Sequence, residues 1–149
     1  MIDLNHLEQY REGNRLEAKK AVGGLPVSLW ETYSAFANTQ GGLILLGVVE
    51  SPDGSLHPID LPDPEGLVMD FWELVNDPGT VSSNLLTDKD VTIEQAEGKR
   101  IVAIRIPKAS GRDFPVYIFG DPLYGAYYRI GDGDFRLFQK KLLESERNP

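Results

Sequence analysis

The chain contains no cysteine, so it can form no disulfide bond and offers no thiolate ligand to a metal ion. This composition fits a reducing, cytoplasmic environment. A long hydrophobic run is also absent: the longest apolar stretch, residues 43–49, is interrupted by Gly47 and is far shorter than the about 20 residues that a membrane-spanning helix needs. The first residues show neither a basic start nor an apolar signal core, so we expect no export signal and no membrane association.

Histidine and positive charge are scarce as well. His6 and His57 are too far apart in the sequence to form a local metal-binding motif. The net charge of −8 at pH 7 is unfavourable for binding phosphates, which depends on Lys and Arg. The charge is uneven, however: it sums to 0 over residues 1–30, to −12 over residues 31–97 and to +4 over residues 98–149. A fold that joins the two ends would present a basic face; otherwise the acidic middle is simply a solvated surface.

The residues that are present indicate one α+β domain spanning residues 1–149. With 41% hydrophobic residues, a chain of this length has enough apolar material for a single core. Spacing and breakers predict helices at residues 3–11, from Pro26 or Ser28 to the glycines at 41–42, at 65–76 and at 138–147. Strands are predicted at residues 15–20, 43–49, 56–59, 91–106 (a hairpin turning at Glu97-Gly98), 114–119 and 125–130. We expect about three helices packed on a mixed, mainly antiparallel sheet of five or six strands.

The segment SAFANTQGGLILLGV, residues 34–48, changes from helical spacing to an aliphatic run across Gly41-Gly42. Glycine accepts the left-handed conformation that ends many helices, so this junction predicts a helix end followed by a buried strand. Gly42 and Gly47 have the glycine spacing of a phosphate loop. No Lys-Ser/Thr pair follows and the segment lies within a strand, so we expect no ATP binding by this domain.

This central block resembles the Schlafen-type AlbA-like domain family when it is taken together with LEAKK before it and IVAIRIPKA, FPVY and GAYYRIGDGD after it. The order of blocks covers about Leu16 to Asp134. The matching positions are Glu17, Lys19, Ala35 to Asn38, Thr39, Gly41, Gly42, Gly47, Val48, Pro115, Tyr117, Tyr128, Arg129 and Gly131. The resemblance implies a module that binds DNA or RNA, with a regulatory role such as transcription regulation. In this family the module is often the N-terminal part of a larger bacterial protein.

The resemblance also implies an alternative, because some relatives look like metal-dependent endoribonucleases built on three carboxylates. It places two of these at Glu12 and Glu17, near Lys19, and the third at Glu50 or at Asp53. Such carboxylates would hold Mg²⁺ or Mn²⁺, which polarises a phosphate, while the lysine offsets the developing charge. Outside this alternative we expect no cofactor. The simpler interpretation of the alternating charges at residues 15–19 is an exposed ion-paired row that contributes about 0–1 kcal/mol.

The candidate nucleic-acid contacts combine cations with a tyrosine and an amide, because stacking and charge suit single strands. They are Arg15, Lys19, Asn38, Arg105, Lys108, Arg112, Tyr128 and Arg129. Tyr127 and Tyr128 point to opposite faces of a strand, so one of them at most can stack on a ligand. Asn38 lies near a helix end, where bonding to local backbone is the usual role. The loop GDGD is expected to be a plain turn, and its aspartates would repel phosphate.

A third interpretation is an acidic protein-interaction or dimerisation domain that has lost nucleic-acid binding. An unpaired hairpin edge would favour a homodimer, because it offers free backbone groups to a second strand.

Overall fold

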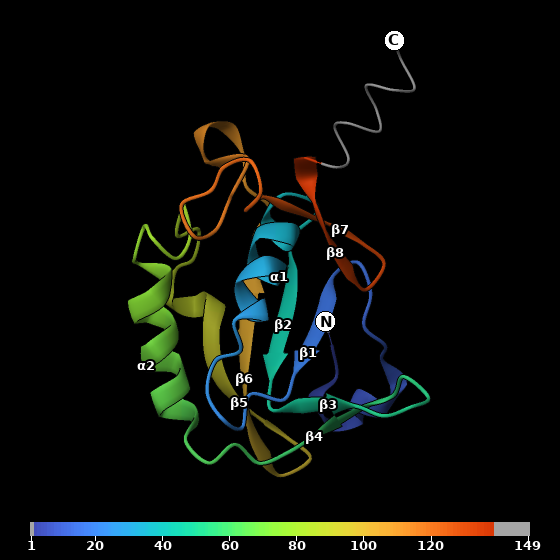
Figure 1. Ribbon diagram of the computed structural model, residues 1–149. Helices are drawn as coiled ribbons and strands as arrows, with labels where there is room; N and C mark the ends of the chain where they lie inside the picture. Colours follow the sequence, from blue (N-terminus) through green and yellow to red (C-terminus); the bar gives the residue numbers. More distant parts are fainter. Residues whose placement is uncertain (1, 139–149) are drawn as a thin grey trace.

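The computed structural model describes residues 2–138, which contain two α-helices, three short 3₁₀ helices (η) and eight strands (Figure 1). In chain order the elements are η1 (Leu4–Gln9), β1 (Leu16–Lys19), α1 (Ser28–Ala37), β2 (Gly42–Leu46), β3 (Val48–Glu50), β4 (Leu56–Pro58), α2 (Pro64–Val75), η2 (Asp88–Asp90), β5 (Val91–Ala96), β6 (Lys99–Ile106), η3 (Gly111–Asp113), β7 (Tyr127–Ile130) and β8 (Gly133–Arg136). The α+β class is confirmed. The helix predicted at residues 138–147 lies, from residue 139 on, outside the described residues. Neither α-helix of the described part has the length and apolar character needed to cross a membrane.

The main sheet has four strands in the order β1-β2-β6-β5, so the prediction of five or six strands was wrong. β1 and β2 are parallel, and the other neighbours are antiparallel. The predicted strand at residues 43–49 breaks at Gly47, whose φ of +89° turns the chain away into a separate β3–β4 hairpin. Residues 114–119 form only isolated bridges, such as Tyr117 with Ala126, and β7 pairs with β8 instead of joining the main sheet.

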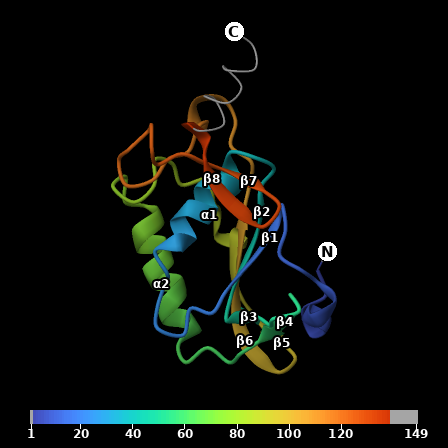
Figure 2. The ribbon, with the colours of Figure 1, turned by 45° about the vertical axis from the view of Figure 1, so that its right-hand side comes forward.

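The two faces of the main sheet have different covers (Figures 1 and 2). Side chains on neighbouring strand positions point to opposite faces, so β2 sends Ile44 toward α1 and α2 and Leu45 toward η1. Under the helices lies the larger core, in which Phe36 and Phe71 are fully buried. The smaller core under η1 is centred on Leu7. The η1 side of the sheet is therefore covered by short elements alone.

The Gly41-Gly42 junction is a close-packed turn. α1 ends at Ala37, and Gly41 then adopts a φ of +75°, as the predicted helix end requires. A Cβ atom on Gly41 would lie 2.7 Å from the Ile106 carbonyl oxygen, and one on Gly42 would lie 2.7 Å from the Phe36 ring. Both glycines thus let β2 approach β6 and the helix closely.

Candidate nucleic-acid interface

A groove of about 870 Å³ opens between the segment that leads into β1 and the ends of β2 and β6. Four cationic side chains line it: Arg11 and Arg15 from the start of the chain, and Arg105 and Lys108 from the end of β6 and the residues after it. All four residues are exposed. None of the described residues that line the groove is acidic. A groove that gathers positive charge in this way attracts polyanions, because a concave surface concentrates the electrostatic field.

The sheet register explains why cations distant in sequence meet here. β1 runs beside β2 with Leu16 opposite Leu43, and β6 runs beside β2 with Arg105 opposite Leu43. These three residues therefore form one row across the sheet, and Arg15 precedes the row directly. The Arg11 guanidinium donates to the carbonyl oxygens of Glu8 (2.8 Å) and Tyr10 (3.0 Å), which fixes its position beside η1.

A buried cluster inside the molecule is built around a single arginine, Arg129. The side chain of Arg129 on β7 has 0% exposure, and its guanidinium forms ion pairs with Glu17 (2.9 Å) and Asp134 (2.8 Å). It lies over the Phe36 ring, with the guanidinium carbon 4.8 Å from the ring centre. Burial acts to lower the pKa of Arg129, but the hydrogen bonds to Asp134 and Glu17 outweigh it and raise the pKa above its ordinary value. This arginine is therefore a charged group of the interior.

The same guanidinium holds the segment that borders the groove. It donates to the carbonyl oxygens of Gly13 (3.0 Å), Leu16 (3.2 Å) and Gly131 (3.1 Å). The Asn14 side-chain oxygen in turn accepts a hydrogen bond from the Gly131 amide at 2.6 Å. Residues 13–16 are thereby attached to the β7–β8 hairpin, which lies more than 110 residues further along the chain.

Ser34 of α1 and Asn38, the residue that follows the helix, bond to the C-terminal part of the chain. Asn38 donates to the carbonyl oxygens of Val116 (2.8 Å) and Tyr127 (2.9 Å), and it accepts from the Val116 amide (2.7 Å). Ser34 bonds the same two residues, with its hydroxyl donating to Val116 and accepting from Tyr127. The Asn38 amide group is thus occupied by backbone partners, although these partners are distant in sequence.

The other candidate contacts lie away from the groove. Tyr128 is 9% exposed and belongs to a small apolar cluster with Ala126 and Leu137. Lys19 donates to the Ser28 hydroxyl at 3.0 Å, and Arg112 is exposed on η3. Of the eight contacts expected from the sequence, the groove brings together Arg15, Arg105 and Lys108. Arg11, which also lines the groove, was not among the contacts expected from the sequence.

Glu12, which lies between the groove residues Arg11 and Gly13, interacts with two further carboxyl groups. Glu12 is half-buried, and burial together with hydrogen bonds to Glu17 and Glu50 raises its pKa to about 9. Its Oε2 atom also accepts from the Ala18 amide at 2.8 Å. Asp53, the other candidate for the third carboxylate, bonds the amide and hydroxyl of Ser55 in its own turn. No group of three or more histidine or acidic side chains among residues 2–138 has an arrangement that could hold a metal ion.

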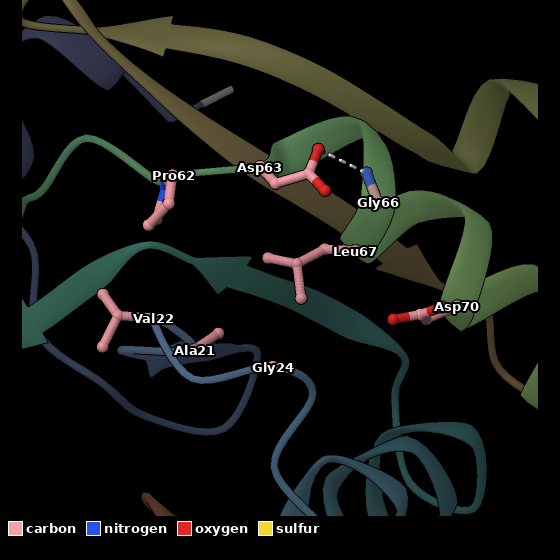
Figure 3. Close-up of a pocket in the computed structure, with 8 residues that line it drawn as sticks. All are labelled: Ala21, Val22, Gly24, Pro62, Asp63, Gly66, Leu67 and Asp70. Atoms are coloured by element: carbon pink, nitrogen blue, oxygen red, sulfur yellow. Dashed lines mark hydrogen bonds between the residues drawn. The ribbon is translucent and has the colours of Figure 1, made fainter.

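A smaller hollow of about 170 Å³ lies between the residues after β1 and the start of α2 (Figure 3). The charged residues that line it, Asp63 and Asp70, are both acidic. Asp63 is occupied as the cap of α2, because its carboxylate accepts from the Gly66 amide at 3.0 Å. The negative charge of these two residues makes the hollow unsuited to binding phosphate. None of the predicted site residues lines it.

Sequence reasoning missed the role of Asp134. Only Gly131 and Asp132 form the turn at GDGD, and β8 begins at Gly133. Asp134 is the direct cross-strand partner of Arg129, and its second oxygen accepts from the Thr32 hydroxyl at 2.7 Å. The spacing of the turn could have revealed this pair. A hairpin with a two-residue turn at Gly131-Asp132 pairs residue 130 with residue 133, and therefore residue 129 with residue 134.

The fold and this groove define the chain as an α+β domain with a basic concave surface on its sheet. It belongs to the family described as Schlafen, AlbA_2, whose model matches residues 12–137. Its structure is similar to the solution NMR structure of the N-terminal domain of a RecG-related protein from Nitrosomonas europaea, a proposed ATP-dependent DNA helicase. That likeness has a TM-score of 0.67 and 30% sequence identity, and covers 91% of this chain and 94% of the other.

The chain is also similar in fold to the DIP2311 protein from Corynebacterium diphtheriae. The TM-score is 0.56 and the sequence identity is 20%, over 91% of this chain, so this similarity concerns the fold alone. The aligned region is 27% of that longer protein. No curated protein matches the chain significantly.

Proposed function

We propose that the chain is a nucleic-acid-binding module that holds DNA or RNA in the groove between β1 and β6. The observation that carries this proposal is the convergence of Arg11, Arg15, Arg105 and Lys108 on a surface with no acidic residue in its described lining. Membership of the AlbA_2 family and the likeness to the N-terminal domain of a RecG-related protein support it. We propose further that residues 1–149 act as one regulatory domain, of the kind found at the N-terminus of larger bacterial proteins.

The negative net charge is compatible with this function because no acidic residue is among the described residues that line the groove, and many acidic residues lie on other parts of the molecule. Many of them belong to the middle of the chain, including the exposed Glu65, Asp70 and Glu73 of α2, which covers the opposite face of the sheet. If all four cations of the groove neutralise phosphates, the logarithm of the binding constant falls with the logarithm of salt concentration with a slope of about −3. Binding is therefore expected to be weak at physiological salt and clear at low salt.

The test is fluorescence anisotropy with labelled DNA and RNA oligonucleotides at low salt and then at rising salt. The double variant Arg105→Glu with Lys108→Glu should abolish binding. Its control is Lys20→Glu with Lys99→Glu, which changes the net charge equally at the opposite end of the sheet and should reduce binding far less. If the two double variants lose binding to the same extent, total charge and not the groove determines it, and the proposal is wrong.

The nuclease alternative can be tested in the same assay. Glu12 interacts with Glu17 and Glu50, although no group of acidic side chains in the described part of the chain is arranged to hold a metal ion. Cleavage of RNA in the presence of Mg²⁺ or Mn²⁺, abolished by Glu17→Gln, would support a metal-dependent nuclease. Binding without cleavage supports the binding module alone. The absence of binding at low salt would leave the protein-interaction or homodimer interpretation, which sedimentation measurements can examine.

A further inference from the structure

We infer that the groove binds single-stranded nucleic acid and not a duplex, an inference that rests on the proposed function. The bases lie on the floor of the groove and the phosphates lie along its rim. The floor and the rim differ in chemistry. The apolar side chains that line the groove include Ile2, Tyr10, Leu16 and Leu43, all of them half-buried. The cations stand on its two sides, Arg11 and Arg15 on one and Arg105 and Lys108 on the other.

The apolar floor is a stable part of the fold. Ile2, Tyr10, Leu16 and Leu43 pack against the smaller core, the one centred on Leu7. The Tyr10 hydroxyl accepts a hydrogen bond from the Asp3 amide at 2.8 Å, which fixes the ring. A fixed aromatic ring beside aliphatic side chains is a surface on which a base can stack, because every base has an apolar π-face.

The shape of the groove argues against a duplex. A duplex turns its phosphates outward, and its base edges are reached only by a helix or a ribbon that projects into the major or minor groove. The protein surface here is concave, so a duplex would touch the rim and leave the apolar floor in contact with water. A single strand can turn its bases inward and keep its phosphates near the rim.

The first test compares single-stranded oligo(dT) and oligo(U) with a duplex, each of about 12 nucleotides, a length within the usual site size for single strands. All probes are measured by anisotropy at the same low salt. We expect a single strand to bind at least about tenfold more tightly than the duplex, since only the single strand can stack a base on the Tyr10 ring. A duplex that binds as tightly as the single strands overturns this inference and leaves the proposed function intact. If neither probe binds, both are overturned.

The second test assigns the preference to the floor. Tyr10→Leu keeps an apolar side chain but removes the ring, so we expect single-strand affinity to fall about fivefold or more while duplex affinity stays constant. Thermal unfolding followed by circular dichroism shows whether the variant keeps its fold. Equal losses for single strand and duplex would contradict a stacking role for the ring.

A third measurement needs no substitution. A single strand that carries 5-iodouracil should crosslink to Tyr10 of the unaltered protein on irradiation, and mass spectrometry identifies the linked residue. Crosslinks confined to residues outside the groove overturn the inference.

Discussion

The groove and the buried cluster contain the same kind of residue in opposite environments. Arg15 and Arg105 are exposed and line a surface without acidic residues in its described part, whereas the Arg129 guanidinium has two carboxylates and three backbone carbonyls around it. Both environments border the same short segment, residues 13–16. The comparison indicates that an arginine is available to bind a phosphate where the fold leaves it exposed and without a carboxylate partner. Arg129 belongs to the framework that supports the groove.

The largest effect on stability is expected from Arg129→Met. The change leaves Glu17 and Asp134 in nearly buried positions without their cation, and breaking a buried pair in this way costs about 3–5 kcal/mol. Urea unfolding measures the loss. Arg112→Met is the matched control, because this arginine is exposed on η3 and its replacement should change stability by less than about 0.5 kcal/mol. Equal losses in the two variants would refute the distinction between framework and surface arginines.

A smaller loss is expected from Gly42→Ala, which tests the junction where β2 enters the groove. The new methyl group would lie 2.7 Å from the Phe36 ring, the ring on which Arg129 rests, and overpacking of this kind costs about 1–3 kcal/mol. Gly23→Ala is the control, since a Cβ atom there meets nothing within 4 Å. In thermal unfolding, the midpoint temperature should fall clearly for Gly42→Ala and stay unchanged for Gly23→Ala.

Glu12→Gln should stabilise the protein, and the gain should grow with pH. In the unfolded chain this carboxyl ionises near its ordinary pKa of 4.5, whereas in the folded protein its pKa is about 9. Between these values the folded state binds more protons, so stability falls as pH rises from about 5 to 9. Glutamine removes this dependence. Because the group is only half-buried, solvent screening limits the expected gain at pH 7 to about 1 kcal/mol.

The pH series contains its own control for that prediction. At pH 5 the carboxyl is protonated in the folded protein, so the variant should then differ least from the parent protein. A gain that is constant from pH 5 to pH 9 would contradict the assignment of the raised pKa to Glu12.

The smallest change in stability, within about 0.5 kcal/mol, is expected from Arg105→Gln, because this arginine is exposed. Its effect should appear in binding: the salt dependence of oligonucleotide binding should lose about one unit of slope, as expected for the removal of one phosphate contact. Arg129→Met and Arg105→Gln would then separate stability from binding. A salt slope that does not change on Arg105→Gln would place the phosphates elsewhere.

Much of the fold could be predicted because its signals are local. The Glu97-Gly98 turn and the glycines after α1 require particular backbone angles, and the structure shows positive φ values at Glu97, Gly98 and Gly41. The number of strands in the main sheet was overestimated because alternation identifies extended chain but not its partner. Nothing in the spacing of residues 125–130 shows that they pair with β8 and not with the main sheet.

The candidate site was only partly predictable, because its contacts are long-range. Strand register places Arg105 in one row with Leu16, the residue that follows Arg15, and no local pattern determines this register. Arg129 was expected at the surface because its partner Glu17 lies 112 residues away. Burial of a charge depends on such partners, and sequence distance gives no measure of them.

The attachment of residues 13–16 to the β7–β8 hairpin also sets a lower limit for any working fragment of this domain. A piece that stopped before Asp134 would remove one of the two anions beside Arg129 and most of β8, the strand that pairs with β7 and so supports the anchor of the groove border. The Leu137 amide donates to the Ala126 carbonyl and closes the hairpin against the rest of the molecule. Deletion variants should therefore retain the chain through residue 137. Shorter variants are expected to unfold even though they still contain the four cations of the groove.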